Sequence, residues 1–154
     1  MHLKVSANWR GFLRRAYCAE IVPHTANPVE TSRSSLTETN NTVPWIFPLR
    51  SRPTLSYKTG GRYFGANRPS RRKHAGCDLI APSGTEVLAM EDGEVLQSYP
   101  FWQGTDALEI KHQGGMIVRY CEISVASGMR PGIRVSKGQV IAHVKRSKKK
   151  TWRC

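Results

Sequence analysis

The strongest constraint on the fold is a series of short apolar runs separated by glycine-containing turns. The runs alternate in polarity or are rich in β-branched residues, and they span 85–90, 93–99, 107–112, 116–123 and 139–144. Turn sequences separate them, namely SGT at 83–85, EDG at 91–93, QGG at 113–115 and SKG at 136–138. This pattern is typical of strands joined by tight connections. We therefore expect an all-β domain with an antiparallel sheet core and hairpin turns at Asp92–Gly93 and Gly114–Gly115.

Three regions differ in composition. A chain of 154 residues has room for one domain of ordinary size. From about residue 21 to 41 the sequence turns to Thr, Ser, Asn and Pro with little that could pack, so we expect residues 1–44 to form a flexible N-terminal arm. Residues 45–144 contain the strand pattern and form the expected β core. Residues 145–154, KRSKKKTWRC, form a basic tail with six Lys or Arg and no acid.

The formal net charge of +13 suggests a polyanionic partner. The sign alone does not distinguish nucleic acid, anionic lipid and an anionic cell-wall polymer. Aromatic residues are not interleaved with the basic ones in a recognisable binding pattern, which argues against a nucleic-acid binder. The basic run 68–74 is expected to be a solvated rim. No apolar run has the length of a signal-peptide core or a membrane span, and the four cysteines form no CxxC pair.

His74 and Asp78 are candidate metal ligands. On a straight strand this spacing would separate them by about 13 Å, so one ion can bind both only if the chain bends. Gly76, between them, permits a bend. Imidazole and carboxylate are good zinc ligands, but a catalytic zinc takes three protein ligands. The pair therefore indicates at most half of a zinc site, and a bare histidine and aspartate at this spacing more often bind no metal at all.

Residues 58–144 supply further motifs in a fixed order. Gly61 and Arg62 precede HAGCD at 74–78, followed by PSGTEV at 82–87, GEV at 93–95, RYCEIS at 119–124 and KGQVIAHV at 137–144. This set resembles the core domain of the lysostaphin-type zinc metallopeptidases, the cell-wall endopeptidases of bacteria and phages. The resemblance implies a zinc cofactor, peptidoglycan as substrate, and action at the cell wall, outside the cytoplasm or delivered by a phage. It also implies that His74 and Asp78 are the first two zinc ligands.

The sequence departs from that family at two places. The family takes its third ligand and its general base from an H-x-H motif, and no H-x-H occurs in these 154 residues. His112 precedes the QGG turn, where similar proteins often carry a histidine without a metal role, and His143 lies on the strand before the missing motif. Glu122 stands where the family has an auxiliary catalytic histidine. Cys77 is a poor substitute ligand, because strand neighbours point to opposite faces.

We therefore identify no catalytic residue and expect zinc to be held weakly or not at all. Loss of a general base alone typically costs about 10² to 10⁴ in rate, so the peptidase should be inactive or strongly impaired. The tail at 145–154 is interpreted as a truncated or out-of-frame end in preference to a segment that grips polyanions. The alternative function is a non-catalytic module that binds peptidoglycan or regulates a partner hydrolase. A basic nucleic-acid binder is the least favoured.

Overall fold

The computed structural model of the chain describes residues 2–8, 45–69 and 71–147. Its regular elements are eight strands and two 3₁₀ turns, without an α-helix in the described ranges. The strands are β1 His2–Asn8, β2 Gly76–Ile80, β3 Glu86–Leu88, β4 Gly93–Pro100, β5 Asp106–His112, β6 Ile117–Val125, β7 Arg134–Val135 and β8 Val140–Val144. The 3₁₀ turns are η1 Trp102–Gly104 and η2 Gln113–Gly115. The prediction of an all-β antiparallel domain is confirmed.

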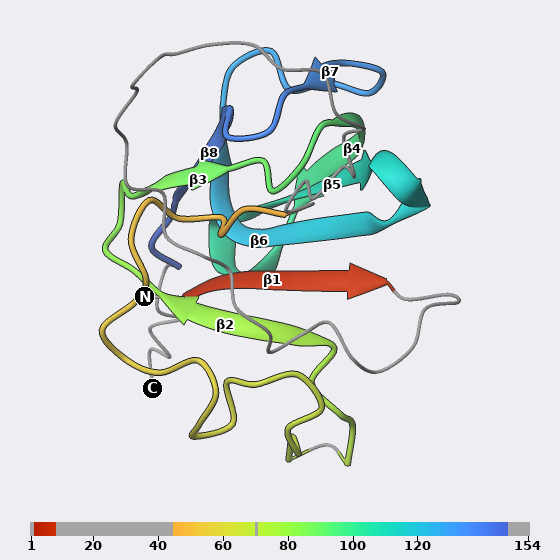
Figure 1. Cartoon of the computed structure of the whole chain (residues 1–154). Coiled ribbons are helices and arrows are strands. Elements are labelled where there is room, and N and C mark those ends of the chain that lie inside the picture. Colours follow the sequence, from red (N-terminus) through yellow and green to blue (C-terminus); the bar gives the residue numbers. More distant parts are fainter. Residues whose placement is uncertain (1, 9–44, 70, 148–154) are drawn as a thin grey trace, which may run out of the picture.

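The strands form one curled antiparallel sheet in the order β2-β1-β6-β5-β4-β7 (Figure 1). Strand β6 is its longest member and pairs with β5 along one edge. Its other edge is shared by two strands: the first half of β6 pairs with β1, and the last three residues pair with β8. Strand β8 in turn pairs with β3. A single strand thus joins the half of the sheet that carries β2 to the half that carries β3 and β8.

The core lies on one face of the central strands. Val95, Ile110 and Val118 are paired across β4, β5 and β6, and all three are fully buried. Leu108 and Tyr120 form the next buried pair. Because side chains alternate between the faces of a strand, the residues between these positions lie on the opposite face. The apolar alternation seen in the sequence therefore fixes which face of each central strand turns inward.

One predicted hairpin is confirmed and the other is wrong. Strands β5 and β6 pair across η2, as the Gly114–Gly115 turn predicted. Strand β3 pairs with β8 and has no ladder to β4, so Asp92–Gly93 joins two strands that are not neighbours. The Asp92 carbonyl accepts the N–H of Gln113, and its carboxylate accepts the N–H of Lys137. These contacts hold the connection against the β5–β6 turn and the β7–β8 loop instead of letting it fold back on β3.

Strand β1 lies in the sheet between β2 and β6 (Figure 1). Sequence analysis placed His2–Asn8 in the flexible arm, whereas here residues 2–6 pair with β2 and residues 4–8 pair with β6. The rest of that arm, residues 9–44, and most of the basic tail, residues 148–154, lie outside the described residues.

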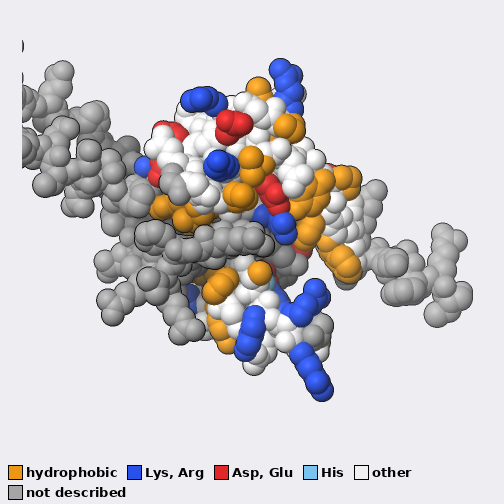
Figure 2. Space-filling model, turned by 90° about the vertical axis from the view of Figure 1, so that its right-hand side faces the viewer, with side chains coloured by type: hydrophobic (Ala, Val, Ile, Leu, Met, Phe, Trp, Pro, Cys, Tyr) orange, Lys and Arg blue, Asp and Glu red, His pale blue; other side chains and the backbone are white. Residues whose placement is uncertain are grey.

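Basic side chains are spread over the surface. On the face shown in Figure 2, Lys and Arg project at several separate places with acidic side chains between some of them. The run 68–74 is only partly the solvated rim that was expected: Arg71, Arg72 and Lys73 are exposed, but Arg68 is half-buried against Asp78. No helix in the described part of the chain is long and apolar enough to cross a membrane.

Candidate metal and peptide site

His74 is held by the loop that precedes it in the chain. It lies two residues before β2, and its backbone exchanges hydrogen bonds with that loop: its N–H donates to Ala66 at 2.8 Å and its carbonyl accepts from Gly65 at 2.7 Å. The ring nitrogen Nδ1 lies 3.1 Å from the carbonyl oxygen of Tyr63. A carbonyl oxygen only accepts, so Nδ1 carries the proton of this bond. In a neutral ring with this tautomer, the lone pair lies on Nε2, on the side of Asp78.

Asp78 lies within β2 and is only 4% exposed. Its N–H donates to the Arg62 carbonyl at 2.9 Å, on the edge of β2 that faces away from β1. Its oxygen Oδ2 accepts a hydrogen bond from Nη2 of Arg68 at 2.8 Å. Its other oxygen, Oδ1, is buried and accepts no hydrogen bond. Burying a carboxylate oxygen without a hydrogen bond costs free energy. This cost suggests that the site is built to give Oδ1 a further partner.

The two side chains meet: Nε2 of His74 lies 3.1 Å from Oδ1 of Asp78. A ring protonated on both nitrogens would form an ion pair at this distance. Oδ1 accepts no hydrogen bond in this arrangement. Two ligands of a tetrahedral zinc lie about 3.3 Å apart when each bond is about 2.0–2.1 Å. The Tyr63 carbonyl binds the other ring nitrogen of His74 and Arg68 binds the other oxygen of Asp78, contacts of the kind that orient the ligands in metal sites.

A polar surface extends from Asp78 across the sheet. Residues directly opposite in antiparallel ladders share a face. By this register, with β1 as the backbone link between β2 and β6, two rows lie on the same face as Asp78: one is Tyr99, Ala107, Cys121 and Asp78, and the other is Gln97, Glu109, Arg119 and Gly76. We call this surface the Asp78 face. It is opposite to the core face of β4, β5 and β6.

Glu109 is the centre of a hydrogen-bond network on the Asp78 face. Its carboxylate accepts from Arg119 at 2.6 Å, from Gln97 at 2.8 Å and from Tyr99 at 3.2 Å. Burial alone would raise the pKa of Glu109, but the hydrogen bonds from Gln97 and Arg119 and the charge of Arg119 outweigh it and leave the pKa lowered. Sequence analysis missed this group. The sequence feature that could have revealed the network is Glu109 in the alternating run 107–112, with Arg119 in the next run.

The model of Peptidase family M23 matches residues 72–153, just over half of the chain, and the matched segment begins two residues before His74. The chain belongs to peptidase family M23. No curated protein and no solved structure matches it. Family M23 is zinc-dependent and acts on peptidoglycan, which confirms the resemblance to the lysostaphin-type enzymes.

A catalytic zinc takes three protein ligands, and His74 and Asp78 were the two expected from the sequence. His74 and Asp78 have suitable donor atoms at suitable separation. Within residues 2–8, 45–69 and 71–147, however, no group of three His, Cys, Asp or Glu side chains could hold a metal ion. His143 is exposed on β8, opposite Glu86 in the β3 ladder. The donor set fits zinc chemistry but is incomplete.

Glu122, which the sequence motif was expected to place at the auxiliary histidine position, lies at an irregular point of β6. The β5–β6 register places Asp106 opposite Ile123 and Ala107 opposite Cys121, so Glu122 is the extra residue of a β-bulge. Its φ of +61° lies in the left-handed region, and its side chain is buried. A bulge re-aims side chains, and strained backbone of this kind is concentrated at functional sites. No residue spacing in the sequence predicts this bulge.

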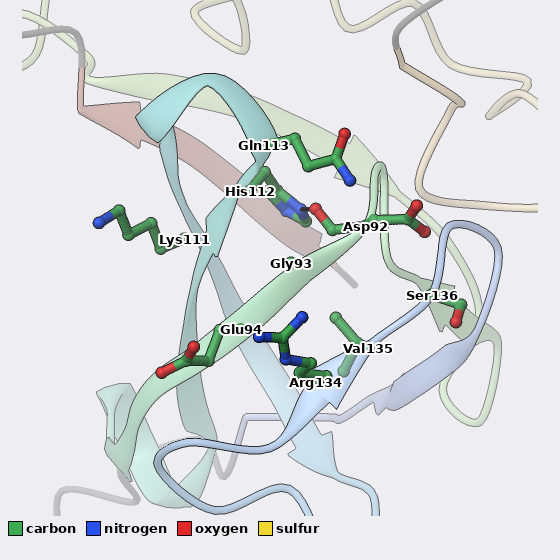
Figure 3. A pocket seen from close by; sticks show the side chains of 9 residues that line it. All are labelled: Asp92, Gly93, Glu94, Lys111, His112, Gln113, Arg134, Val135 and Ser136. Atoms are coloured by element: carbon green, nitrogen blue, oxygen red, sulfur yellow. Dashed lines mark hydrogen bonds between the residues drawn. The ribbon is translucent and has the colours of Figure 1, made fainter.

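His112 has a structural role in a different part of the sheet. A shallow hollow of about 440 Å³ lies there, lined by Asp92, Gly93, Glu94, Lys111, His112, Gln113, Arg134, Val135 and Ser136 (Figure 3). None of His74, Asp78 and Glu122 lines it. Nδ1 of His112 donates to the Asp92 carbonyl, and Nε2 lies 3.1 Å from the Tyr120 hydroxyl. Burial lowers the pKa of His112, against the raising effect of the Asp92 and Glu91 carbonyls. The ring is therefore neutral and links β5 to β6 and to the turn that precedes β4.

Proposed function

We propose that this chain is a peptidoglycan-recognising domain of family M23 whose His74–Asp78 pair is half of a zinc site, so that its peptidase activity is absent or strongly impaired. The observation that carries this proposal is the 3.1 Å approach of Nε2 to Oδ1 without a third ligand in the described part of the chain. The convergence supports a metal-binding origin for the pair. The missing third ligand supports weak zinc retention, because affinity depends on the full coordination set.

The Asp78 face has the chemistry to hold a peptide. Arg119 leaves nearly half of its side chain exposed while it binds Glu109, and a guanidinium has five N–H donors, more than Glu109 uses. Gln97 is exposed and Tyr99 half-buried beside it. These groups suit the carboxylate and amide groups of the peptides that cross-link peptidoglycan. Peptide recognition by this face does not require a metal ion, so binding can persist where hydrolysis is lost.

Glu122 favours the second candidate function, a module that binds peptidoglycan or regulates a hydrolase without cutting. Where the family uses imidazole, this chain has a carboxylate. An ionised carboxylate accepts hydrogen bonds but donates none, whereas an imidazole N–H can donate to a developing oxyanion. Together with the absent H-x-H, this substitution removes both the proton acceptor and the donor that the family supplies.

The test measures zinc, binding and hydrolysis on the same purified chain. After dialysis we expect well under one zinc per chain, co-sedimentation with insoluble peptidoglycan, and no clearing of a peptidoglycan zymogram. His74→Ala should remove the residual zinc, with His143→Ala, an exposed histidine outside the site, as the matched control. Arg119→Met should weaken co-sedimentation. Stoichiometric zinc with chelator-sensitive hydrolysis would refute the impaired site, and failure to sediment would refute recognition. Stimulation or inhibition of a separate M23 hydrolase would favour the regulatory form.

A further inference from the structure

Residues 50–73, which lead into β2, form a strongly basic stretch that we call the basic segment. It contains eight of the 24 Lys and Arg of the chain and none of the 11 Asp and Glu. On the lower part of the molecule in Figure 2, several Lys and Arg side chains lie beside hydrophobic ones. The eight cations are Arg50, Arg52, Lys58, Arg62, Arg68, Arg71, Arg72 and Lys73.

Most of this charge faces solvent. Acidic side chains from the sheet pair with Arg50 and Arg68. Arg62 and Lys73 donate to uncharged oxygen atoms within the segment, so these bonds leave their charges in place. The exposed cations are Arg50, Arg52, Lys58, Arg71, Arg72 and Lys73. A surface of this kind attracts an anionic partner.

The basic segment also carries exposed apolar side chains. Four large hydrophobic residues are exposed in the part of the chain that the structure describes, and three of them belong to this segment: Leu55 at 48%, Tyr63 at 44% and Phe64 at 50%. The fourth, Trp102, lies in η1. Single exposed apolar side chains are normal on a protein surface, but their concentration within one basic stretch marks an interaction site.

Hydrogen bonds hold the apolar side chains on a fixed framework. Nε of Arg62 donates to the Ser56 carbonyl at 2.8 Å and so closes the loop between these two residues. Leu55 precedes this loop and Tyr63 follows it, so the closure draws the two toward each other. The Arg62 carbonyl accepts the N–H of Asp78, which fixes the loop to the edge of β2.

A second loop, residues 65–74, holds three consecutive cations. Its ends are joined by the hydrogen bond from the Gly65 N–H to the His74 carbonyl at 2.7 Å. The cations at 71–73, RRK, are all exposed on the arm that returns to β2. Cations and apolar side chains therefore lie on two adjoining loops, both anchored at the start of β2.

This combination distinguishes the three anionic partners that net charge alone leaves open. A hydrophilic cell-wall polymer would bind the cations but offer nothing apolar to Leu55 and Tyr63. Bases of a nucleic acid could stack on Tyr63, but the aliphatic Leu55 has no face for stacking. An anionic bilayer suits both kinds of side chain, because its headgroups bind Lys and Arg and its interface accepts aromatic and aliphatic groups.

We propose that the basic segment is a docking surface for an anionic lipid bilayer. Its cations bind the phosphate groups of the lipids, while Leu55, Tyr63 and Phe64 enter the boundary between headgroups and acyl chains. Three apolar side chains bury little area, so the binding is reversible and depends on the charges. The inference goes beyond the proposed function and requires neither zinc nor peptidoglycan.

The experiment measures co-sedimentation of the full chain with vesicles at low salt. Binding to phosphatidylcholine vesicles that contain phosphatidylglycerol should exceed binding to phosphatidylcholine alone by about tenfold or more, and added salt should weaken it. Lys58→Gln with Arg71→Gln should reduce the binding by about tenfold or more. Lys111→Gln with Arg134→Gln, which removes two exposed cations of the sheet, is the matched control and should reduce it much less.

A second pair of variants tests the apolar contribution at constant charge. Leu55→Ser with Tyr63→Ser should weaken binding to the anionic vesicles by about tenfold, because both side chains leave water on docking. Trp102→Ser, the exposed apolar residue outside the segment, is its control and should bind as the unmodified chain does. All four positions in the two segment variants are exposed, so the urea midpoint should stay unchanged.

Four results would overturn the proposal. If the apolar variant binds anionic vesicles as well as the unmodified chain, the partner is a hydrophilic polyanion. Tighter binding to a single-stranded oligonucleotide than to the vesicles, weakened by both segment variants, would assign the surface to nucleic acid. Equal losses in the control variants would show that residues 50–73 are not the binding surface. Absence of vesicle binding at low salt would reject docking outright, without bearing on zinc retention or peptidoglycan recognition.

Discussion

Arg68 donates a hydrogen bond of 2.8 Å from Nη2 to Oδ2 of Asp78, and so binds the carboxylate oxygen that His74 does not face. The Asp78 side chain is 6% exposed, and that of Arg68 is 35% exposed. The pair is therefore a partly buried ion pair in which one partner keeps contact with water. Its effect is to fix the rotation of the carboxylate, which leaves Oδ1 directed at Nε2 of His74.

We predict that Arg68→Met destabilises the fold by about 1–3 kcal/mol. Removing one partner of a fully buried ion pair costs about 3–5 kcal/mol, and the partial exposure of Arg68 reduces that figure. In urea unfolding, Arg68→Met combined with Asp78→Asn should cost less than the sum of the single changes by about 1 kcal/mol. Arg50→Met breaks the exposed pair with Glu86 and is the matched control, expected to cost about 0.5 kcal/mol or less. Strict additivity would contradict the coupling.

We predict that stability falls as the pH drops below about 6.5, and that His112 accounts for part of the fall. Burial holds the pKa of His112 below its ordinary value in the folded chain. Between that lowered pKa and about 6.5, the unfolded chain binds a proton that the folded chain does not, so acid favours unfolding; above about 6.5 the contribution is constant.

Unfolding free energies of the unmodified chain and His112→Gln at pH 7.5 and 5.5 test this. The variant should be less stable at pH 7.5 because the bonds to Asp92 and Tyr120 change, yet it should lose less stability on acidification. His143→Gln alters an exposed histidine and should keep the original pH dependence. Equal pH dependence in His112→Gln and the unmodified chain would show that His112 does not carry the effect.

We predict that Gly93→Ala destabilises the fold by about 1–3 kcal/mol. A Cβ at this position would lie 2.7 Å from the Lys111 carbonyl oxygen and 2.9 Å from both Nδ1 of His112 and Cγ2 of Ile110. Two of these neighbours are fixed in the core, so the added methyl group acts as overpacking. The measurement is the urea midpoint, with Ser98→Ala, an exposed position on the same strand, as control. Wild-type stability in Gly93→Ala would show that β4 can shift away from β5.

Local pattern predicted the central strands well, and the reason is visible in β5 and β6. Their buried positions Leu108, Ile110, Val118 and Tyr120 alternate along the chain, and a short turn joins them. The Asp92–Gly93 hairpin failed because a turn sequence specifies a change of direction but not the partner strand. Gly93 is required for its close approach to β5, a contact that does not exist until the sheet is assembled.

The site was predictable only in part for the same reason. His74 and Asp78 were found from their spacing, because both belong to one short segment. Arg68 was interpreted as solvated, since a basic run carries no sign of which member turns inward. The position of β1 could not be foreseen: its ladder partners are more than 60 residues away, and a strand's register with a distant partner is not encoded in its own seven residues.

Deletion of the N-terminal strand shows whether β1 is part of the folded domain. The composition of residues 1–44 predicts an arm that can be removed without loss, whereas the ladders of β1 predict a loss. Deleting residues 1–8 removes five paired positions with β2 and five with β6. At about 0.2–1 kcal/mol for each cross-strand pair, we expect destabilisation of about 2 kcal/mol or more, measured by urea unfolding.

A second variant separates the strand from the segment that follows it. Replacing residues 10–43 with a Gly-Ser linker of equal length keeps β1 and its tether, and should leave the unfolding free energy within about 0.5 kcal/mol of the original. In the chain lacking residues 1–8, a synthetic peptide of those residues should restore stability in a concentration-dependent way, because the slot between β2 and β6 accepts an antiparallel strand. Full stability after deletion of residues 1–8 would place β1 outside the folding unit, and β2 would then have to be held by the Arg62 and Arg68 contacts of the preceding loop alone.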